Sequence, residues 1–448
     1  MKSLPAVPHA SQWNTLLERC MTVSVEGRVR AIRGTTIVAG GLPTPIGALV
    51  RIKRRQGTEL DAEVIGFDGA TTLLAPLSPM DGVSQGDSVR LHRTIRTVPA
   101  GVDLVGRVLD ATGEPIDDLG PLAPSIRVPC DAMPVPALDR PPIKKVLPTQ
   151  VRAIDAFLTL GYGQRIGVFA GSGVGKSTLL GMLARGTAAD VVVIGLIGER
   201  GREVLEFLER DLAEEGRRKS VTVVATSDTP APKRILAAKT ATAIAEAYRD
   251  AGKNVLLLMD SVTRFAMAQR EVGLAAGEVP TTRGYPPSVF SMLPQLVERT
   301  GMSTRGSITA IYTVLVEGDD TNEPISDALR GLLDGHVHLS RSIASRGRYP
   351  AIDILPSLSR LQSQLVDPQH RTWARELRAL MATYQENEDL INIGAYTKGS
   401  NINIDRAILM RESIEAFLSQ EQRDLIPFKE TLAAMQALVQ PQKLASAA

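Results

Sequence analysis

The sequence predicts an α/β fold with a parallel sheet, preceded by a small antiparallel β-barrel and followed by a helical region. Short alternating runs punctuated by glycine and proline occupy residues 22 to 93, which is typical of a small barrel. Beyond the proline-rich stretch at 129–148, continuous apolar runs alternate with helical patterns, as in a sheet covered on both faces. After about residue 375 the pattern is mostly helical.

The composition is that of an ordinary globular protein. Its 51 basic residues nearly cancel 49 acidic ones, so the net charge is only +2 and no overall field would draw the protein onto nucleic acid or anionic lipid. Cys20 and Cys130 form no CxxC pair, which argues against a zinc site or a disulfide framework and fits a reducing cytoplasm. We find neither a secretory signal core nor a membrane-length apolar window. Peripheral membrane association stays open.

The N-terminal segment, residues 1–21, is predicted to contain an amphipathic helix. Its apolar positions follow helical spacing: Trp13, Leu16, Leu17 and Cys20. The helix can bind a partner or pack on its own domain, and we take the segment as partner-binding. In the following barrel, residues 22–93, the basic run 51–55 fits a solvated hairpin.

Five apolar runs are the expected strands of the parallel sheet, and two later segments are the clearest helices. The strands are Ile166–Phe169, Val191–Leu196, Val221–Ala225, Val255–Met259 and Ile308–Val316, and the helices are Trp373–Tyr384 and Arg406–Ser419. The tail after Pro441 is expected to fray.

A phosphate-binding loop follows the first of these strands. It consists of Ala170, Gly171, Ser172, Gly173, Val174, Gly175, Lys176, Ser177 and Thr178, and a helix is expected over 177–186. The glycines let backbone N–H groups point at phosphate oxygens, and the helix N-terminus adds its positive dipole end. Lys176 would reach the β- and γ-phosphates, and Ser177 would bind Mg²⁺. Ala170 replaces the usual first glycine, which is tolerable if its φ is negative.

Two further motifs complete a site for ATP hydrolysis. Asp260 ends an apolar strand, as does the carboxylate that holds Mg²⁺ beside a phosphate loop. Glu199, directly after another strand, is our candidate for polarising the attacking water, with Arg200 close to the γ-phosphate. By spacing alone, the run from Glu199 to Glu203 fits a surface salt-bridge cluster better, and only the family resemblance given below reverses that preference.

Together these stretches resemble the flagellar protein export ATPases. The resemblance rests on residues 169–177, 195–204, 260–271, 284–290 and 333–336, and it covers about residues 20–430. That family is similar to the injectisome type III secretion ATPases and, more distantly, to the catalytic subunit of rotary ATP synthases. Rotary catalytic subunits carry a strongly acidic loop where this chain has residues 394–401 without an acidic residue, which favours the export branch.

The resemblance implies a RecA-like nucleotide domain, residues 94–375, between the barrel and a C-terminal helical domain, residues 376–448. Six subunits would form a ring with ATP and Mg²⁺ at the interfaces. Glu199 matches the catalytic glutamate, Arg200 the arginine beside it, and Arg360 the arginine finger given to a neighbour's nucleotide. Tyr349 matches the aromatic against the adenine ring, and Phe428 has the spacing of a second one.

The implied function is ATP-driven protein export through a bacterial flagellar type III apparatus. Partners would be stalk and regulator proteins, the export gate, chaperones and substrates, at the cytoplasmic face of the inner membrane. Three alternatives stay open: an injectisome ATPase, a ring-shaped nucleic-acid motor of the transcription-terminator kind, and a noncatalytic ring scaffold. Against the motor, residues 21–93 contain one aromatic, Phe67, where base stacking needs several. His336 and His338 lack a third metal ligand nearby and are expected to be structural.

Overall fold

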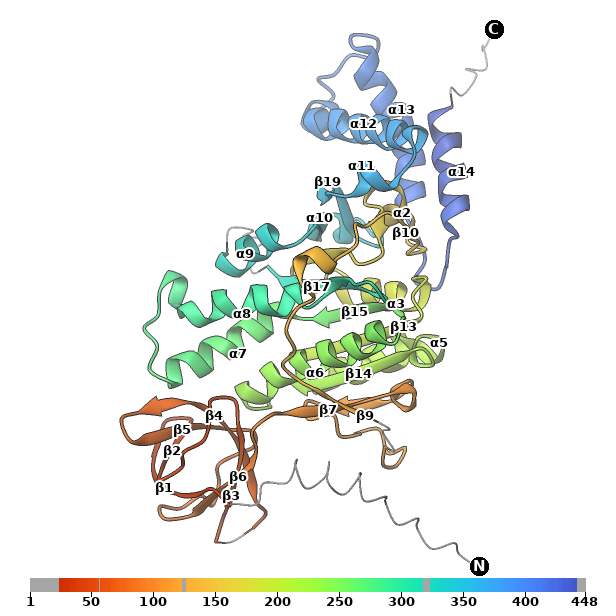
Figure 1. Cartoon of the computed structure of the whole chain (residues 1–448). Coiled ribbons are helices and arrows are strands. Elements are labelled where there is room, and N and C mark those ends of the chain that lie inside the picture. Colours follow the sequence, from red (N-terminus) through yellow and green to blue (C-terminus); the bar gives the residue numbers. More distant parts are fainter. Residues whose placement is uncertain (1–23, 56, 123–125, 317–322, 441–448) are drawn as a thin grey trace, which may run out of the picture. The chain divides into compact units, whose positions relative to one another are not determined.

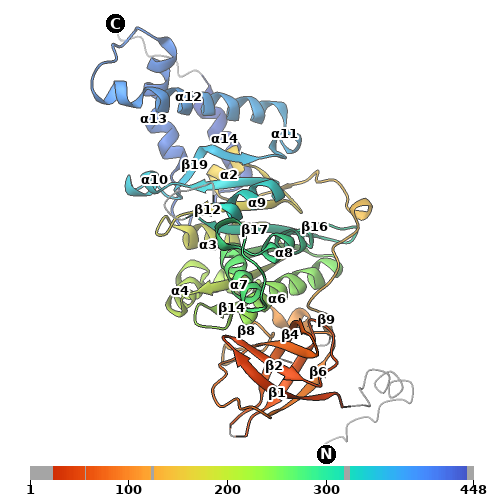
Figure 2. The ribbon, with the colours of Figure 1, turned by 90° about the vertical axis from the view of Figure 1, so that its left-hand side faces the viewer.

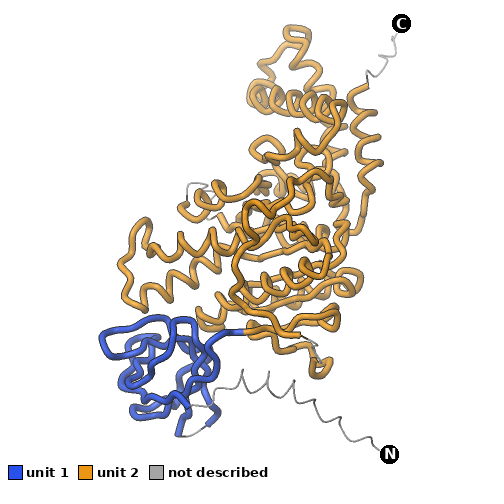
Figure 3. Tube along the Cα trace, in the orientation of Figure 1, with its two compact units in different colours: residues 1–96 blue, residues 97–448 orange. Residues whose placement is uncertain are grey.

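The structure is a computed structural model that describes residues 24–55, 57–122, 126–316 and 323–440 (Figures 1 and 2). The chain divides into two compact units, Met1–Arg96 and Thr97–Ala448 (Figure 3). The predicted N-terminal helix and the tail after Pro441 lie outside the described residues. Because residues 97–448 form one unit and a helix runs through residue 375, the domain boundary predicted there stays a prediction.

The first unit contains the predicted β-barrel. Six antiparallel strands close on themselves in the order β1-β2-β5-β4-β3-β6, with β6 paired to β1. Alternate residues point inward, so Val50 and Ile52 of β3 are buried while Arg51 and Lys53 are not. The basic run therefore has its charges outside the barrel. The strands are β1 (Glu26–Arg33), β2 (Thr36–Gly40), β3 (Leu49–Lys53), β4 (Leu60–Asp68), β5 (Thr71–Pro76) and β6 (Ser88–Arg93).

The second unit is built on a nine-stranded sheet, and all five predicted strands belong to it. The order is β19-β18-β12-β17-β15-β13-β14-β8, with β16 paired to β17. The strands from β18 to β8 run parallel, and β19 is antiparallel to β18. The strands are β8 (Val108–Asp110), β12 (Arg165–Ala170), β13 (Val191–Glu199), β14 (Ser220–Thr226), β15 (Asn254–Asp260), β16 (Gly301–Met302), β17 (Ser307–Leu315), β18 (Gly335–Leu339) and β19 (Ile352–Ser359).

Helices cover both faces of this sheet, which explains why its strands are continuous apolar runs. Along β13, Val191 and Val193 pack with helices α6, α7 and α8, whereas Val192 and Ile194 pack with α2, α3 and the C-terminal helices (Figure 1). The helices are α2 (Arg152–Phe157), α3 (Lys176–Gly186), α4 (Gly201–Glu206), α5 (Ala213–Arg217), α6 (Ala231–Asp250), α7 (Val262–Ala275), α8 (Pro287–Glu298), α9 (Pro324–Leu332) and α10 (Arg341–Ser345), with a π-helical turn at Phe207–Asp211.

The C-terminal part is helical, as predicted. Helix α12 begins after Asp367, whose side chain accepts from His370 N, with Pro368 in the first turn; α13 begins after Asn401, which caps Asn403 N. Buried faces of α12, α13 and α14 join the core around α2 and α3. The helices are α11 (Gln362–Leu365), α12 (Pro368–Asn392), α13 (Ile402–Leu418) and α14 (Phe428–Val439).

Short elements connect these parts. Two small two-stranded sheets pair β7 (Thr97–Ala100) with β9 (Ile126–Pro129) and β10 (Val146–Leu147) with β11 (Leu160–Gly161). Three 3₁₀ turns lie at Val102–Leu104, Ala137–Asp139 and Thr282–Gly284. Among the described residues, no helix combines the length and the apolar character needed to cross a membrane.

Candidate active site

The phosphate loop connects β12 to α3, as the sequence predicts. Gly173 and Gly175 have φ of 78° and 85°, a left-handed conformation that glycine adopts without strain. No side chain caps α3, and its first backbone bond runs from Leu179 N to Gly175 O. The N–H groups at the start of the helix therefore remain for an anion. Ala170 closes β12 and is not among the described residues with positive φ, so its methyl group is tolerated.

Three charged side chains from different elements meet beside this loop. The Lys176 Nζ lies 2.6 Å from Asp260 Oδ1 and 3.0 Å from Glu199 Oε1. Asp260 ends β15 and Glu199 ends β13, and these neighbouring parallel strands finish at the same edge of the sheet. The parallel topology thus gathers residues that are 84 and 23 positions from Lys176 in the chain.

The electrostatics of this cluster follow from one ammonium shared by two carboxylates. Burial lowers the pKa of Lys176, but the charges of Asp260 and Glu199 outweigh it, so the net shift is upward and Lys176 stays protonated. Burial raises the pKa of Asp260; Lys176 lowers it and Glu199 raises it again, which leaves the pKa above its ordinary value. An ion pair alone would have lowered it. The pKa stays raised because burial disfavours the charged carboxylate and the single cation cannot compensate both anions.

Glu199 and Arg200 point to different environments. The register of the pairing between β13 and β14 shifts between Ile197 and Glu199, and Gly198 has a φ of 72° at this point. The Arg264 side chain packs where a Cβ of residue 198 would stand. This bulge turns Glu199 toward Lys176. The Arg200 side chain is 81% exposed and pairs with Glu203 at 3.3 Å. The two interpretations of this run therefore apply to different residues: Glu199 joins the cluster, and Arg200 lies in a surface ion pair.

Thr313 is a member of the site that the sequence did not reveal. Its Oγ1 donates to Asp260 Oδ1 at 2.7 Å from the adjacent strand β17. The side chain is fully buried and sits in a run of apolar residues, so nothing in the sequence marks it. Asp260 consequently has two donors, Lys176 and Thr313, that hold its carboxylate in place.

A second unpredicted contact joins the phosphate-loop helix to the segment between α13 and α14. Asp211, in the π-helical turn after α4, accepts from Thr178 Oγ1 at 3.4 Å and from Gln422 Nε2 at 2.8 Å through its Oδ1. The Arg185 guanidinium also donates to the backbone oxygens of Asp211 and Gln422. Thr178, predicted as a phosphate-loop residue, thus also anchors this segment.

The two predicted adenine-wall aromatics lie in different surroundings. A Cβ added at Gly175 would lie 3.3 Å from Tyr349 Cε1, so the Tyr349 ring sits directly on the loop while remaining 44% exposed. Phe428 begins α14 and packs edge to face on His370, with ring centroids 6.1 Å apart. No ring contact joins Phe428 to Tyr349 in the described chain. The residue of this region that reaches Tyr349 is Gln420, whose N–H donates to Tyr349 O at 2.8 Å.

Arg360 follows β19 and is exposed. Its guanidinium donates to Arg330 O at 3.2 Å, and its N–H donates to Asp334 O at 2.9 Å. No contact between Arg360 and residues 170–178 is found in the described structure. His338 stacks on Phe169 of β12 with 5.3 Å between ring centroids, and His336 meets the same ring edge to face at 6.1 Å. Among the described residues, no group of three His, Cys, Asp or Glu side chains could hold a metal ion.

Comparisons with known proteins give this geometry a context. Residues 150–359 match the model of the ATP synthase alpha/beta family nucleotide-binding domain, and residues 366–437 match the T3SS EscN ATPase C-terminal domain. The flagellum-specific ATP synthase of Bacillus subtilis is 50% identical over 92% of this chain and 94% of its own. The type 3 secretion system ATPase of Xanthomonas euvesicatoria is also 50% identical, over 93% and 96%.

The chain belongs to this family of flagellar and type III secretion ATPases. Its fold agrees with that of the assembled ATPase EscN from enteropathogenic E. coli, with a TM-score of 0.87 and 45% identity over 92% of this chain and 99% of that one. The predicted resemblance is confirmed, as are the barrel, the nucleotide-binding α/β core and the C-terminal helices of this ATPase.

Proposed function

We propose that this ATPase hydrolyses Mg-ATP at the interfaces of a homohexameric ring and couples hydrolysis to protein export through a bacterial flagellar type III apparatus. The observation that carries the catalytic part is the meeting of Lys176, Asp260 and Glu199 at the N-terminus of α3. A cation for the phosphates, a buried carboxylate for the metal and a second carboxylate for water are the groups that phosphoryl transfer requires.

The residues present fit ATP and Mg²⁺. Uncapped N–H groups and Lys176 would bind the phosphates. Ser177 and Asp260 would hold Mg²⁺, since one ammonium leaves the two carboxylates with an uncompensated negative charge, and the phosphates supply further oxygens. When bound, Mg²⁺ neutralises charge on the phosphate oxygens. Glu199 would orient the attacking water, and Tyr349 on the loop would pack against the adenine.

Arg360 is proposed to act on the nucleotide of a neighbouring subunit. Its exposed position beyond β19, with its guanidinium on Arg330 O, suits a group that faces another chain. An arginine supplied from a second subunit stabilises the charge on the transferring phosphoryl group, so hydrolysis would depend on assembly. The similar ATPase EscN has been solved as an assembled form in complex with its central stalk EscO, which supports a ring and a stalk partner here. Arg200 would contribute beside Glu199 only after leaving its surface pair with Glu203.

The substitution Glu199→Gln tests the catalytic assignment. It keeps the side-chain size but removes the carboxylate that orients water, so we expect kcat to fall roughly 10²- to 10⁴-fold with little change in ATP affinity. Glu206→Gln is a matched control nearby, because Glu206 forms its ion pair at the surface with the exposed Arg202. Unchanged hydrolysis in Glu199→Gln, measured as released phosphate, would remove Glu199 from the mechanism, whereas no phosphate release from the unsubstituted protein would favour a noncatalytic scaffold.

The export role and the flagellar branch form the finer part of the proposal. Both flagellum-specific and type 3 secretion relatives support export, and the flagellar assignment adds stalk and regulator proteins, the export gate, chaperones and substrates as partners at the cytoplasmic face of the inner membrane. Deletion of the gene should abolish motility and external filament protein while sparing injectisome secretion. The reverse pattern would assign the chain to an injectisome.

A nucleic-acid motor is the alternative from another class. Phe67 is the single Phe, Tyr or Trp in residues 24–96, and it is 53% exposed, so the barrel offers one stacking platform at most. We therefore expect hydrolysis to be insensitive to single-stranded RNA in a titration at constant salt. Strong stimulation by RNA would overturn the export assignment.

A further inference from the structure

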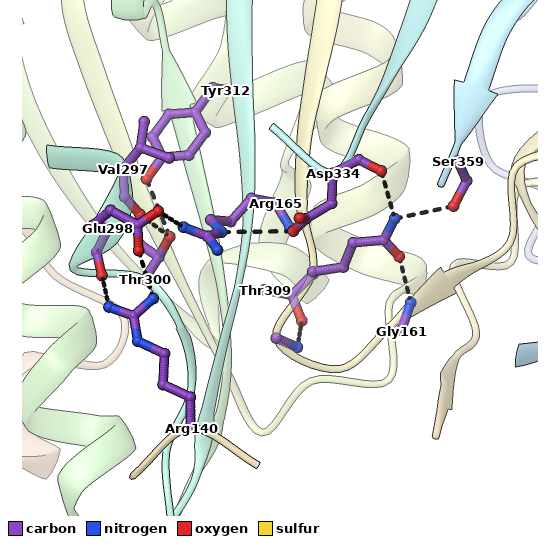
Figure 4. A network of polar contacts seen from close by, with 12 residues as sticks. Arg140, Gly161, Arg165, Val297, Glu298, Thr300, Thr309, Tyr312, Asp334 and Ser359 are labelled. Atoms are coloured by element: carbon purple, nitrogen blue, oxygen red, sulfur yellow. Dashed lines mark hydrogen bonds and ion pairs between the residues drawn. The ribbon is translucent and has the colours of Figure 1, made fainter. Parts of the chain in front are cut away.

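A polar network surrounds the first residue of β12 (Figure 4), and the phosphate loop follows the other end of this strand. Its centre is Arg165, the first residue of β12, whose Nη1 lies 2.7 Å from Glu298 Oε1. Glu298 also pairs with Arg140 at 2.6 Å. On its other side, Arg165 meets Asp334, which lies in the turn between α9 and β18 (Figure 4). The network thus joins the base of the strand that carries the phosphate loop to the turn before β18.

Asp334 is fastened by its side chain to Arg165. Its Oδ2 accepts from Arg165 N–H at 3.0 Å and lies 3.5 Å from Arg165 Nε. The second distance is that of an ion pair without a hydrogen bond, because Arg165 Nε has no aligned acceptor. The guanidinium is largely buried, and the pKa of Arg165 is raised: burial lowers it, but the charges of Asp334 and Glu298 more than compensate. The carboxylate therefore has a fixed position.

Arg360 is held at two points, one in this turn and one in the helix α9 that precedes it. Asp334 O accepts from Arg360 N–H at 2.9 Å, and Arg330 O accepts from its guanidinium at 3.2 Å. The residue before Arg360, Ser359, is held as well, by the fully buried Gln164. The Gln164 Nε2 donates to Ser359 Oγ at 3.0 Å and lies 3.4 Å from Asp334 O. The exposed Arg360 consequently stands on backbone that buried groups hold in place.

We propose that Asp334 is a positioning residue for Arg360. It acts through the hydrogen bond and ion pair between its carboxylate and Arg165, and the hydrogen bond between Gln164 and Ser359 stabilises the same backbone. This rests on the proposed role of Arg360 at a neighbour's nucleotide. An arginine finger is effective only when its guanidinium is correctly placed at the reacting phosphate, because a displacement of about 1 Å costs on the order of 10²-fold in rate. Loosening the turn should thus impair the neighbour's site while leaving the subunit's own nucleotide binding intact.

The test uses Asp334→Ala in the full chain. We expect kcat of the assembled ring to fall at least about tenfold, and the Kd for ATP to stay within about twofold of wild type. Asp334→Asn keeps an oxygen that can accept from Arg165 N–H and should restore most of the activity. Ser359→Ala, which removes the contacts with Gln164 and Thr159 O with little change in volume, should give a smaller loss of kcat, again without a change in Kd.

Mixed rings separate positioning from general damage. Lys176→Ala subunits lack a working site but keep Arg360, whereas Asp334→Ala subunits keep their site. In random rings of equal amounts, an intact site meets an intact finger at about a quarter of interfaces, so activity should return to roughly 25% of wild type. Asp117→Ala is the control for stability, because it breaks a buried ion pair with Arg107 away from this network and should leave turnover unchanged.

The outcomes distinguish the two levels of the proposal. Mixing Arg360→Ala with Lys176→Ala must restore activity if the arginine acts on a neighbour; failure overturns the interfacial role and the inference with it. If that pair is rescued but Asp334→Ala with Lys176→Ala is not, Asp334 does not act through Arg360. Undiminished kcat in Asp334→Ala alone would overturn the positioning role as well.

Discussion

Thr313→Val tests whether the hidden threonine holds the carboxylate of Asp260. The substitution is close to isosteric at a fully buried position, so it leaves no cavity. It removes the 2.7 Å hydrogen bond to Asp260 and a longer one, 3.3 Å, to Met259 O. A hydrogen bond to a charged group contributes about 1.5–3 kcal/mol, against about 0.5–1.5 kcal/mol for one between neutral groups. We expect Thr313→Val to lower the free energy of unfolding by about 2 kcal/mol where Asp260 is ionised.

A matched control separates the effect of the charged acceptor from the effect of losing a buried hydrogen bond. Thr242 is as deeply buried, and its Oγ1 donates to a neutral acceptor, Ala238 O, at 2.8 Å within α6. Thr242→Val should therefore cost about 1 kcal/mol or less. The difference between the two variants is measured by equilibrium urea unfolding of the full chain, followed by circular dichroism. Both threonines belong to residues 97–448, so the same transition reports on both substitutions.

The pH dependence gives the assay a second readout. The Thr313 bond favours the ionised form of Asp260, whose pKa is raised in the fold because of burial. The extra loss in Thr313→Val should be present above that raised pKa, where Asp260 is ionised, and should shrink as the pH falls through it and the carboxyl is protonated. Thr242→Val should show no such change. Equal costs for the two variants across the whole pH range of the measurement would refute the assignment of an ionised, Thr313-held Asp260.

The other predictions concern rings beside the phosphate loop. Tyr349→Ala should weaken ATP binding by about 1–3 kcal/mol, or roughly 5- to 150-fold, because the adenine loses its stacking surface, whereas Tyr349→Phe should bind normally in a calorimetric titration. Equal affinities for both variants would exclude a stacking role. Burial and the nearby charges of His336 and Arg330 lower the pKa of His338 to about 4. Protonating it opposes folding, so stability should fall as the pH drops from 6.5 to 4, and His338→Phe should flatten that slope in thermal melts while keeping the contact with Phe169. An unchanged slope would contradict this interpretation.

Local sequence was sufficient to predict those elements whose residue types follow from backbone conformation or from hydrophobic periodicity. The left-handed turns at Gly173 and Gly175 need glycine, and buried strands between two helical layers need unbroken apolar runs. The loop, the five strands and the C-terminal helices could therefore be predicted, and the carboxylate at the end of β15 could be recognised from its position. The family resemblance added Glu199, Tyr349 and Arg360, which spacing alone did not distinguish from surface residues.

The tertiary structure decided how these residues meet. Sheet order places β13 and β15 side by side, so Glu199 and Asp260 share Lys176, and it places Thr313 of β17 against Asp260 from within an apolar strand. The contact between Arg165 and Asp334 likewise depends on the sheet, because Asp334 lies in a turn 169 residues after Arg165 in the chain. Such contacts arise from strand order and register, which one sequence does not encode as a local pattern, because each partner taken alone is an ordinary polar residue. The sequence by itself determined the chemistry of the phosphate loop, whereas only the packed sheet determined which side chains hold that chemistry in place.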